Sequence, residues 1–147
     1  MGWLRLQYRE VLILMSKIYE NILLPVDGSQ QSIDSFKQGV HLARQWDSNV
    51  YLVRVVKEDD GQDIPKEQRE SLLNSLKEFA RNERISLESE LIYGDPRTQI
   101  AEVLVDRWSI DLIVLGATGK GRVAKMLIGS ITDYVVRNAQ CDVLISR

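Results

Sequence analysis

The chain has 147 residues, of which 44% are hydrophobic and 27% charged, and its formal net charge is −2. This length and composition are typical of one globular domain and exclude a globally disordered chain. The net charge does not call for a nucleic-acid partner, and no apolar run reaches the ~20 residues that a membrane span needs. The single cysteine and single histidine exclude an intrachain disulfide and a zinc finger.

Residues 1–18 precede the regular pattern of the chain. Arg9 and Glu10 interrupt their apolar character, and the apolar stretch 11–15 is too short for a signal-peptide core. We interpret residues 1–18 as an N-terminal extension, either a short packing arm or sequence ahead of a natural start at Met15. Residues 19–147 are then the domain.

From Tyr19 onward, strand-like apolar runs alternate with amphipathic, helix-like segments. Apolar runs, β-branched at 50–56, predict strands at 22–26, 50–56, 111–115 and 143–145, and an alternating pattern predicts a strand at 87–93. Apolar residues every three or four positions predict helices at 33–46, 65–80, 96–108 and 131–138. This alternation predicts an α/β fold, a three-layer sandwich with a parallel sheet between two layers of helices.

Two details of the predicted helices concern single side chains. The third helix, which Pro96 opens, is predicted to turn its apolar residues toward the core; these are Ile100, Val103, Leu104 and Trp108. Ser130 is predicted to cap the N-terminus of the fourth helix, because serine side chains accept hydrogen bonds from free N–H groups there.

Two predicted strand ends carry the residues of a candidate ligand site. The first strand runs into PVDGS (25–29), and the fourth runs into LGATGKG (115–121). In open parallel sheets, ligands bind beyond the carboxyl ends of the strands, where the strand order reverses. If the first and fourth strands are neighbours, these two segments flank one crevice.

The segment from Gly116 to Gly129 suits a phosphate group. Its glycines let backbone N–H groups approach an anion, the helix that begins near Ser130 offers further free N–H groups, and Lys120 and Arg122 add positive charge. Asp27 is a candidate for ribose hydroxyls or, indirectly, for a metal ion. The alternatives are a solvated loop, a turn role for Asp27, and a simple helix cap at 129–130.

The spacing of the glycines distinguishes between nucleotide signatures. The sequence GATGKGRV (116–123) lacks the Lys and Ser/Thr of a Walker A loop at the required positions, and the dinucleotide fingerprint fits only loosely. The pattern G-2x-G-9x-G-[ST] fits without adjustment at Gly116, Gly119, Gly129 and Ser130. With PVDGS after the first strand and CDVLI (141–145) at the end, the chain resembles the universal stress protein family over residues 19–147.

The resemblance implies a fold, a ligand and its contacts. The family fold is adenine nucleotide alpha hydrolase-like, a parallel sheet of order 3-2-1-4-5, and the motif marks its ATP-binding branch, so ATP with Mg²⁺ or Mn²⁺ is the implied ligand. By position, the residues that would line the nucleoside are Pro25, Val26, Asp27, Val55, Leu115 and Gly116. Those that would hold or border the phosphates are Gly119, Lys120, Gly121, Arg122, Gly129, Ser130, Ile131 and Thr132. Arg54 replaces a histidine that is frequent in the family, and we expect little effect on binding.

Efficient catalysis is not expected. We interpret His41 as a surface or packing residue and Cys141 as structural, and neither a Ser-His-Asp set nor a Walker B strand can be assembled. The last strand, from Val143 to Ile145, would be an apolar edge of the sheet. Such edges invite pairing, and family members commonly dimerise there, so we expect a homodimer.

Three functions remain as hypotheses. The first is an ATP-binding regulatory protein of the stress response in the cytoplasm, in which the nucleotide biases a dimer or partner surface. The second is a slow ATP hydrolase or phosphotransferase that uses the same site, and the third is an interaction module that keeps the fold without nucleotide.

Overall fold

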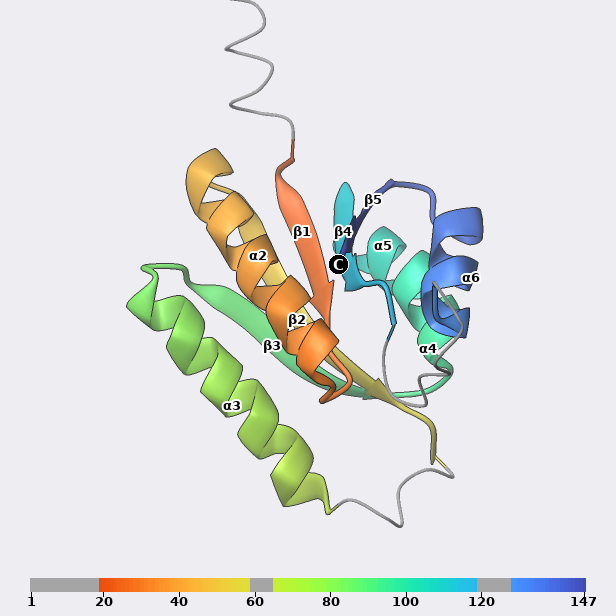
Figure 1. Cartoon of the computed structure of the whole chain (residues 1–147), viewed down its shortest axis with the longest axis horizontal. Coiled ribbons are helices and arrows are strands. Elements are labelled where there is room, and N and C mark those ends of the chain that lie inside the picture. The colour runs from red at the N-terminus through yellow and green to blue at the C-terminus, as the bar shows by residue number, and fades with distance from the viewer. Residues whose placement is uncertain (1–18, 59–64, 119–127) are drawn as a thin grey trace, which may run out of the picture.

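A computed structural model describes residues 19–58, 65–118 and 128–147, so the predicted extension lies outside it (Figure 1). The strands are β1 (Asn21–Pro25), β2 (Asn49–Val56), β3 (Leu87–Tyr93), β4 (Leu112–Gly116) and β5 (Asp142–Ser146). The helices are α2 (Gln30–Trp46), α3 (Lys66–Asn82), α4 (Pro96–Thr98), the π-helical η2 (Gln99–Val103), α5 (Leu104–Arg107) and α6 (Ser130–Asn138).

The strands form one parallel sheet in the order β3-β2-β1-β4-β5. The predicted α/β class and strand order are therefore confirmed. Strand β1 lies beside β4, with Ile22 opposite Leu112 and Leu23 opposite Ile113. The chain thus places β2 and β3 on one side of β1 and later places β4 and β5 on its other side.

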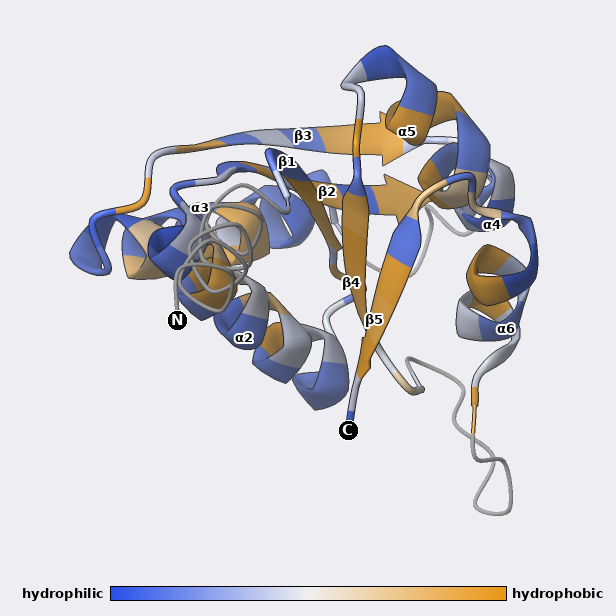
Figure 2. Cartoon of the chain, turned by 90° about the horizontal axis from the view of Figure 1, so that it is seen from above, coloured by the Kyte–Doolittle hydropathy of each residue, from blue (hydrophilic) through white to orange (hydrophobic). Residues whose placement is uncertain are grey.

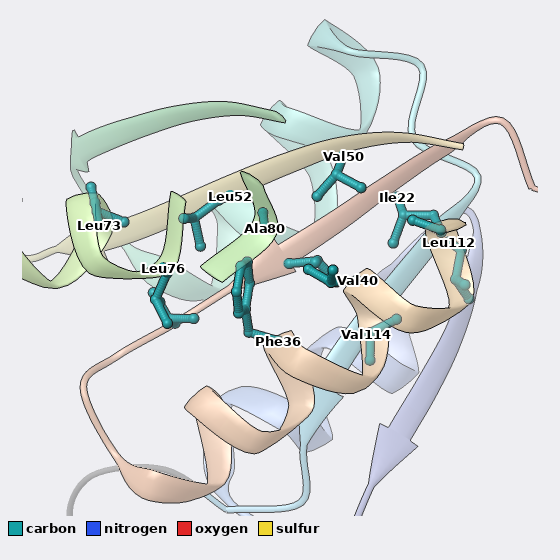
Figure 3. Close-up of a cluster of buried hydrophobic side chains, with 13 residues drawn as sticks. Ile22, Phe36, Val40, Val50, Leu52, Leu73, Leu76, Ala80, Leu112 and Val114 are labelled. Carbon is teal, nitrogen blue, oxygen red and sulfur yellow. The ribbon is translucent and has the colours of Figure 1, made fainter. Parts of the chain in front are cut away.

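Helices cover both faces of the sheet, as Figure 2 shows. On one face, α2 and α3 cover a cluster that includes Phe36, Leu76, Ile22 and Leu52 (Figure 3). On the other face, η2, α5 and α6 cover a second cluster that includes Leu23. Because β1 and β4 are buried on both faces, their sequences are nearly continuous apolar runs.

The third predicted helix contains an irregularity that the sequence pattern did not indicate. Its middle part, η2, is a π-helical turn between α4 and α5. A π-turn adds a residue to the helical repeat and so shifts the later positions around the axis. Ile100 and Leu104 are buried as predicted, but Val103 is 48% exposed, and Ala101 is fully buried in its place. The prediction that Val103 faces the core was wrong.

Helix α2 packs closely on β1 at Gly39. A β-carbon at this position would overlap Cδ2 of Leu24 and lie 3.0 Å from its Cδ1. Leu24 is fully buried, so its side chain has little room to move. The glycine therefore sets how closely the helix approaches the sheet.

Substituting Gly39→Ala should lower the free energy of unfolding by about 1 kcal/mol, although alanine is the better helix former by ~1 kcal/mol. In a Leu24→Val background the overlapping Cδ atoms are gone, so the same substitution should become neutral or stabilising. Urea unfolding of the four proteins measures both differences. A Gly39→Ala effect of the same sign and size in both backgrounds would contradict the proposed steric cause.

Candidate functional site

A pocket opens at the carboxyl ends of β1 and β4. Its lining comes from the β1–α2 turn, the end of β2, the start of α4 with η2, and the end of β4 with the start of α6. The residues are Pro25, Val26, Asp27, Ser32, Val55, Pro96, Ile100, Leu115, Gly116, Thr118, Gly129, Ser130, Ile131 and Thr132. The pocket lies where the strand order reverses, which is the usual ligand position in such sheets.

The structure brings most of the predicted contact residues to this one pocket. Those that line it are Pro25, Val26, Asp27, Val55, Leu115, Gly116, Gly129, Ser130, Ile131 and Thr132. The others, Gly119, Lys120, Gly121 and Arg122, lie outside the described residues. Sequence reasoning missed Ser32, Pro96, Ile100 and Thr118 as lining residues, and only Thr118, inside the glycine pattern, carried a signal. The molecule that these residues bind stays a prediction.

The β1–α2 turn is held by its own side chains. The backbone N–H of Ser29 donates to Oδ1 of Asp27 at 2.9 Å, and the N–H of Asp27 donates to Oγ of Ser32 at 3.2 Å. Gly28 between them has a φ of +87°, which a glycine adopts without strain. Ser29 caps α2 by accepting a hydrogen bond from the N–H of Ser32. The turn role of Asp27 is therefore compatible with its place in the pocket lining.

The β4 end and the start of α6 are joined by hydrogen bonds. The N–H of Gly129 donates to the carbonyl of Ala117 at 2.7 Å, and the hydroxyl of Thr132 donates to the carbonyl of Gly116 at 2.8 Å. Gly129, with φ −70° and ψ 161°, is the N-cap of α6, and Ser130 is the first helical residue. The predicted cap at Ser130 was wrong by one position, because the extended backbone ends at the glycine.

The N-terminus of α6 gives the pocket its positive end. The first bond of the helix joins the N–H of Asp133 to the carbonyl of Gly129, at 2.9 Å. The N–H groups of Ser130, Ile131 and Thr132 precede this bond and have no intrahelical acceptor. All three residues line the pocket. Free N–H groups and the helix dipole together favour an anion at this end.

Another part of the lining is apolar. Val55, Pro96, Ile100 and Leu115 contribute aliphatic side chains from four different elements. Ile100 belongs to η2 and is only 5% exposed. A pocket that combines an apolar wall with an anion-favouring helix end suits a ligand with a flat ring system and a negatively charged group.

Two buried arginines interact electrostatically with each other, and one of them, Arg54, also interacts with Asp27. Arg54 of β2 is 7% exposed and Arg69 of α3 is 3% exposed. Burial lowers the pKa of the Arg54 guanidinium, and the positive charge of Arg69 lowers this pKa further, whereas Asp27 acts in the opposite direction. The burial of Arg69 was not predicted, because it lies in a helix sequence that looks polar. The small effect expected of Arg54 on ligand binding stays a prediction.

Comparisons with known proteins decide the family. The sequence profile of the universal stress protein family matches residues 18–147. The chain belongs to the universal stress protein family. A universal stress protein of Methanocaldococcus jannaschii is 30% identical over 140 residues, which cover 87% of this chain and 82% of the relative.

Solved universal stress protein structures share the fold. UspA from Lactobacillus plantarum has a TM-score of 0.79 and 30% identity, over 88% of this chain and 98% of that one. A universal stress protein in complex with cAMP has a TM-score of 0.71 and 23% identity, over 88% and 97% of the two chains. One from Archaeoglobus fulgidus in complex with dAMP has a TM-score of 0.71 and 21% identity, over 88% and 99%.

Within residues 19–58, 65–118 and 128–147, no three His, Cys, Asp or Glu side chains converge into a metal-binding group. Nor does any helix there have the length and apolar character needed to cross a bilayer. The indirect metal role of Asp27 stays a prediction.

The two candidate nucleophile or base residues lie apart from the pocket lining. His41 is exposed on α2, with Nε2 at 3.9 Å from a carboxylate oxygen of Glu83. Cys141 is half-buried just before β5. Burial, followed by the charges of Asp142 and Asp111, raises the pKa of the Cys141 thiol to about 11. A thiol with so high a pKa is a poor nucleophile at neutral pH.

Cys141 should therefore react slowly with iodoacetamide in the folded protein. With a pKa of about 11 instead of 9, its thiolate fraction at pH 8 is lower by roughly a hundredfold than in the unfolded chain. The rate should rise about tenfold per pH unit up to the folded pKa. Since the chain has one cysteine, mass spectrometry reads the reaction directly, with the urea-unfolded chain as control. A rate that levels off near pH 9 would contradict this prediction.

Proposed function

We propose that this universal stress protein is an ATP-binding regulatory protein of the stress response. The observation that carries the proposal is the make-up of the pocket, which combines an apolar wall with the N-terminus of α6. The residues that the family pattern assigns to adenosine supply much of the wall, and those assigned to the phosphates begin α6. An adenine nucleotide has this same division into a flat ring system and an anionic end.

The solved neighbours support the ligand class. Structures of universal stress proteins in complex with cAMP and with dAMP share this fold. Both ligands are adenine nucleotides with one phosphate. The triphosphate is proposed here because the full glycine pattern of the ATP-binding branch is present, from Gly116 and Gly119 to Gly129 and Ser130.

In the proposed complex, each part of the ligand meets a matching part of the pocket. The adenine lies against Val55, Ile100 and Leu115, and Asp27 accepts hydrogen bonds from the ribose. The phosphates lie at the N–H groups of Ser130 and Ile131. A Mg²⁺ or Mn²⁺ ion would neutralise phosphate charge, with Asp27 acting on it indirectly.

The proposal predicts that Mg-ATP stabilises the folded protein after removal of nucleotide carried through purification. At about 100 times its Kd, a ligand adds ~2.7 kcal/mol to the free energy of unfolding, which is roughly 5–10 °C in Tm for a domain of this size. Thermal melts with and without Mg-ATP measure this shift. No shift at millimolar ATP would remove the ATP proposal and favour the nucleotide-independent interaction module. Phosphate release from the same samples tests the slow hydrolase.

Ser130→Asp tests the location of the phosphates, because its effects on stability and on binding have opposite signs. A carboxylate in the first turn of α6 interacts favourably with the helix dipole and should raise the unfolding free energy without ligand by ~0.3–1 kcal/mol. The same charge should repel the phosphates and raise the Kd for ATP by about tenfold or more. Ser130→Asn, similar in size but neutral, is the matched control. Equal ATP affinity of both variants would place the phosphates elsewhere.

We also propose that a second copy of the chain pairs with the β5 edge. The β3 edge carries Glu88 and Glu90, and charge on an edge strand resists pairing. The β5 edge carries apolar residues, among which Leu144 is 40% exposed. If β5 paired with β5 of a second copy about a two-fold axis, the β5 edges of both copies would be covered at once.

Leu144→Lys should therefore shift the protein from dimer to monomer, because it places a charge in the proposed interface. Tyr93→Lys is the control, since Tyr93 is 45% exposed but lies on the β3 edge. Sedimentation velocity over a concentration series measures both variants. A monomeric wild type, or a dimer that survives Leu144→Lys and dissociates with Tyr93→Lys, would contradict this interface.

A further inference from the structure

A hydrogen-bonded pair that includes Gln31, a residue with no role in the family pattern, ties α2 to the end of β4. The side-chain oxygen Oε1 of Gln31 accepts hydrogen bonds from both the backbone N–H and the hydroxyl of Thr118, the first at 2.8 Å. The two residues are 87 positions apart in sequence. Gln31 lies in the first turn of α2, and Thr118 is the second residue after β4.

The backbone contact beside this pair shows that it is built into the fold. A β-carbon at Gly116 would lie 3.1 Å from the carbonyl oxygen of Gln31 and 3.2 Å from its carbonyl carbon. The first turn of α2 therefore packs directly on the last residue of β4, in a space that suits glycine. This packing brings the Gln31 side chain to Thr118, which is 7% exposed.

Thr118 directly precedes Gly119 and Lys120 in the sequence, two residues that the family pattern assigns to the phosphates. Gly129, at the start of α6, is held to the residue before Thr118, since the N–H of Gly129 donates a hydrogen bond to the carbonyl of Ala117. The bonds to residues 117 and 118 thus hold the end of β4 to the start of α6 and to the first turn of α2. Gln31 supplies one of these two anchors and does not itself line the pocket.

We propose that Gln31 is a positioning residue for the phosphate end of the pocket. By accepting both Thr118 hydrogen bonds, it fixes Thr118, which lines the pocket together with Gly129 and Ser130. Without this oxygen, two nearly buried donors of Thr118 would lack their acceptor, and the chain would have to shift to satisfy them. The inference rests on the proposed nucleotide function and deepens it.

The test compares ATP with adenosine, by isothermal titration calorimetry, in the full chain. Gln31→Met removes the acceptor oxygen and keeps the length and helix propensity of the side chain. It should raise the Kd for ATP by about tenfold, the order expected for loss of anchoring hydrogen bonds, and leave the Kd for adenosine within about twofold. Gln38→Met, at an exposed position of the same helix, is the matched control and should leave both unchanged.

Gln31→Glu separates positioning from direct contact. It keeps an acceptor oxygen for Thr118 and adds a negative charge. A positioning role predicts rescue, with an ATP affinity close to that of the wild type. Direct contact between Gln31 and the phosphates predicts weaker binding than in Gln31→Met, because like charges would then meet.

The outcomes distinguish this inference from the proposed function. If the wild type binds neither ATP nor adenosine, the proposed function fails, and the inference fails with it. If the wild type binds ATP and Gln31→Met binds it equally well, only the inference is overturned. Equal losses for ATP and adenosine, or a Gln31→Glu variant weaker than Gln31→Met, would also overturn it. Far-UV circular dichroism of each variant confirms that the compared proteins are folded.

Discussion

The pairing of β1 with β4 is the constraint on which the rest of this structure depends. Their hydrogen bonds set Ile22 opposite Leu112 and Leu23 opposite Ile113, so the carboxyl ends of the two strands lie side by side. The β1–α2 turn and the β4 end meet there, although they are far apart in sequence. Because each strand is covered on both faces, the pair is buried and its register is strongly specified. The pocket is a consequence of this register.

Helix α2 packs closely on both strands of this pair, and this packing fixes the position of its first turn beside the pocket. Gly39 lets the helix approach Leu24 of β1, and Gly116 lets the first turn of the same helix approach the end of β4. The helix therefore contacts both central strands through positions where a side chain would collide. Its first turn is fixed relative to both, and so are Ser32 and Gln31. Buried charge nearby adds a further constraint, since Arg54 and Arg69 would be costly in this setting without compensating interactions.

Sequence reasoning predicted the elements and the class of the fold because these depend on short-range patterns. The apolar runs at β1 and β4 and the helical spacing of Phe36, Val40 and Ala43 have one straightforward interpretation each. The strand order needed the family resemblance, since the residues alone suggest but do not establish which strands are neighbours. Most of the pocket-lining residues were predicted from the same resemblance. It assigns a role to each position in the sequence but carries no information on what that position contacts in this structure.

The features that sequence reasoning missed depend on local geometry or on long-range contacts. The π-turn that exposes Val103 leaves the apolar spacing intact, so the pattern fits a regular helix equally well. The cap of α6 moved from Ser130 to Gly129 because backbone conformation decides the position, and both residues are good caps. The bond between Gln31 and Thr118 joins a surface-like glutamine to a distant loop, and no single-sequence pattern encodes such a pair.

The hydrogen bonds within the pocket also limit which donors it can offer to a ligand. The hydroxyls of Ser32, Thr118 and Thr132 each donate their proton to the protein, at Ser29, Gln31 and Gly116. None of these three hydroxyls therefore keeps a proton to donate to a phosphate oxygen, and the Ser32 oxygen also accepts from the N–H of Asp27. Within the described lining, the first turn of α6 supplies backbone N–H groups that have no intrahelical acceptor. A nucleotide would thus be held in one direction, with its anionic end at α6, before any charged side chain contributes.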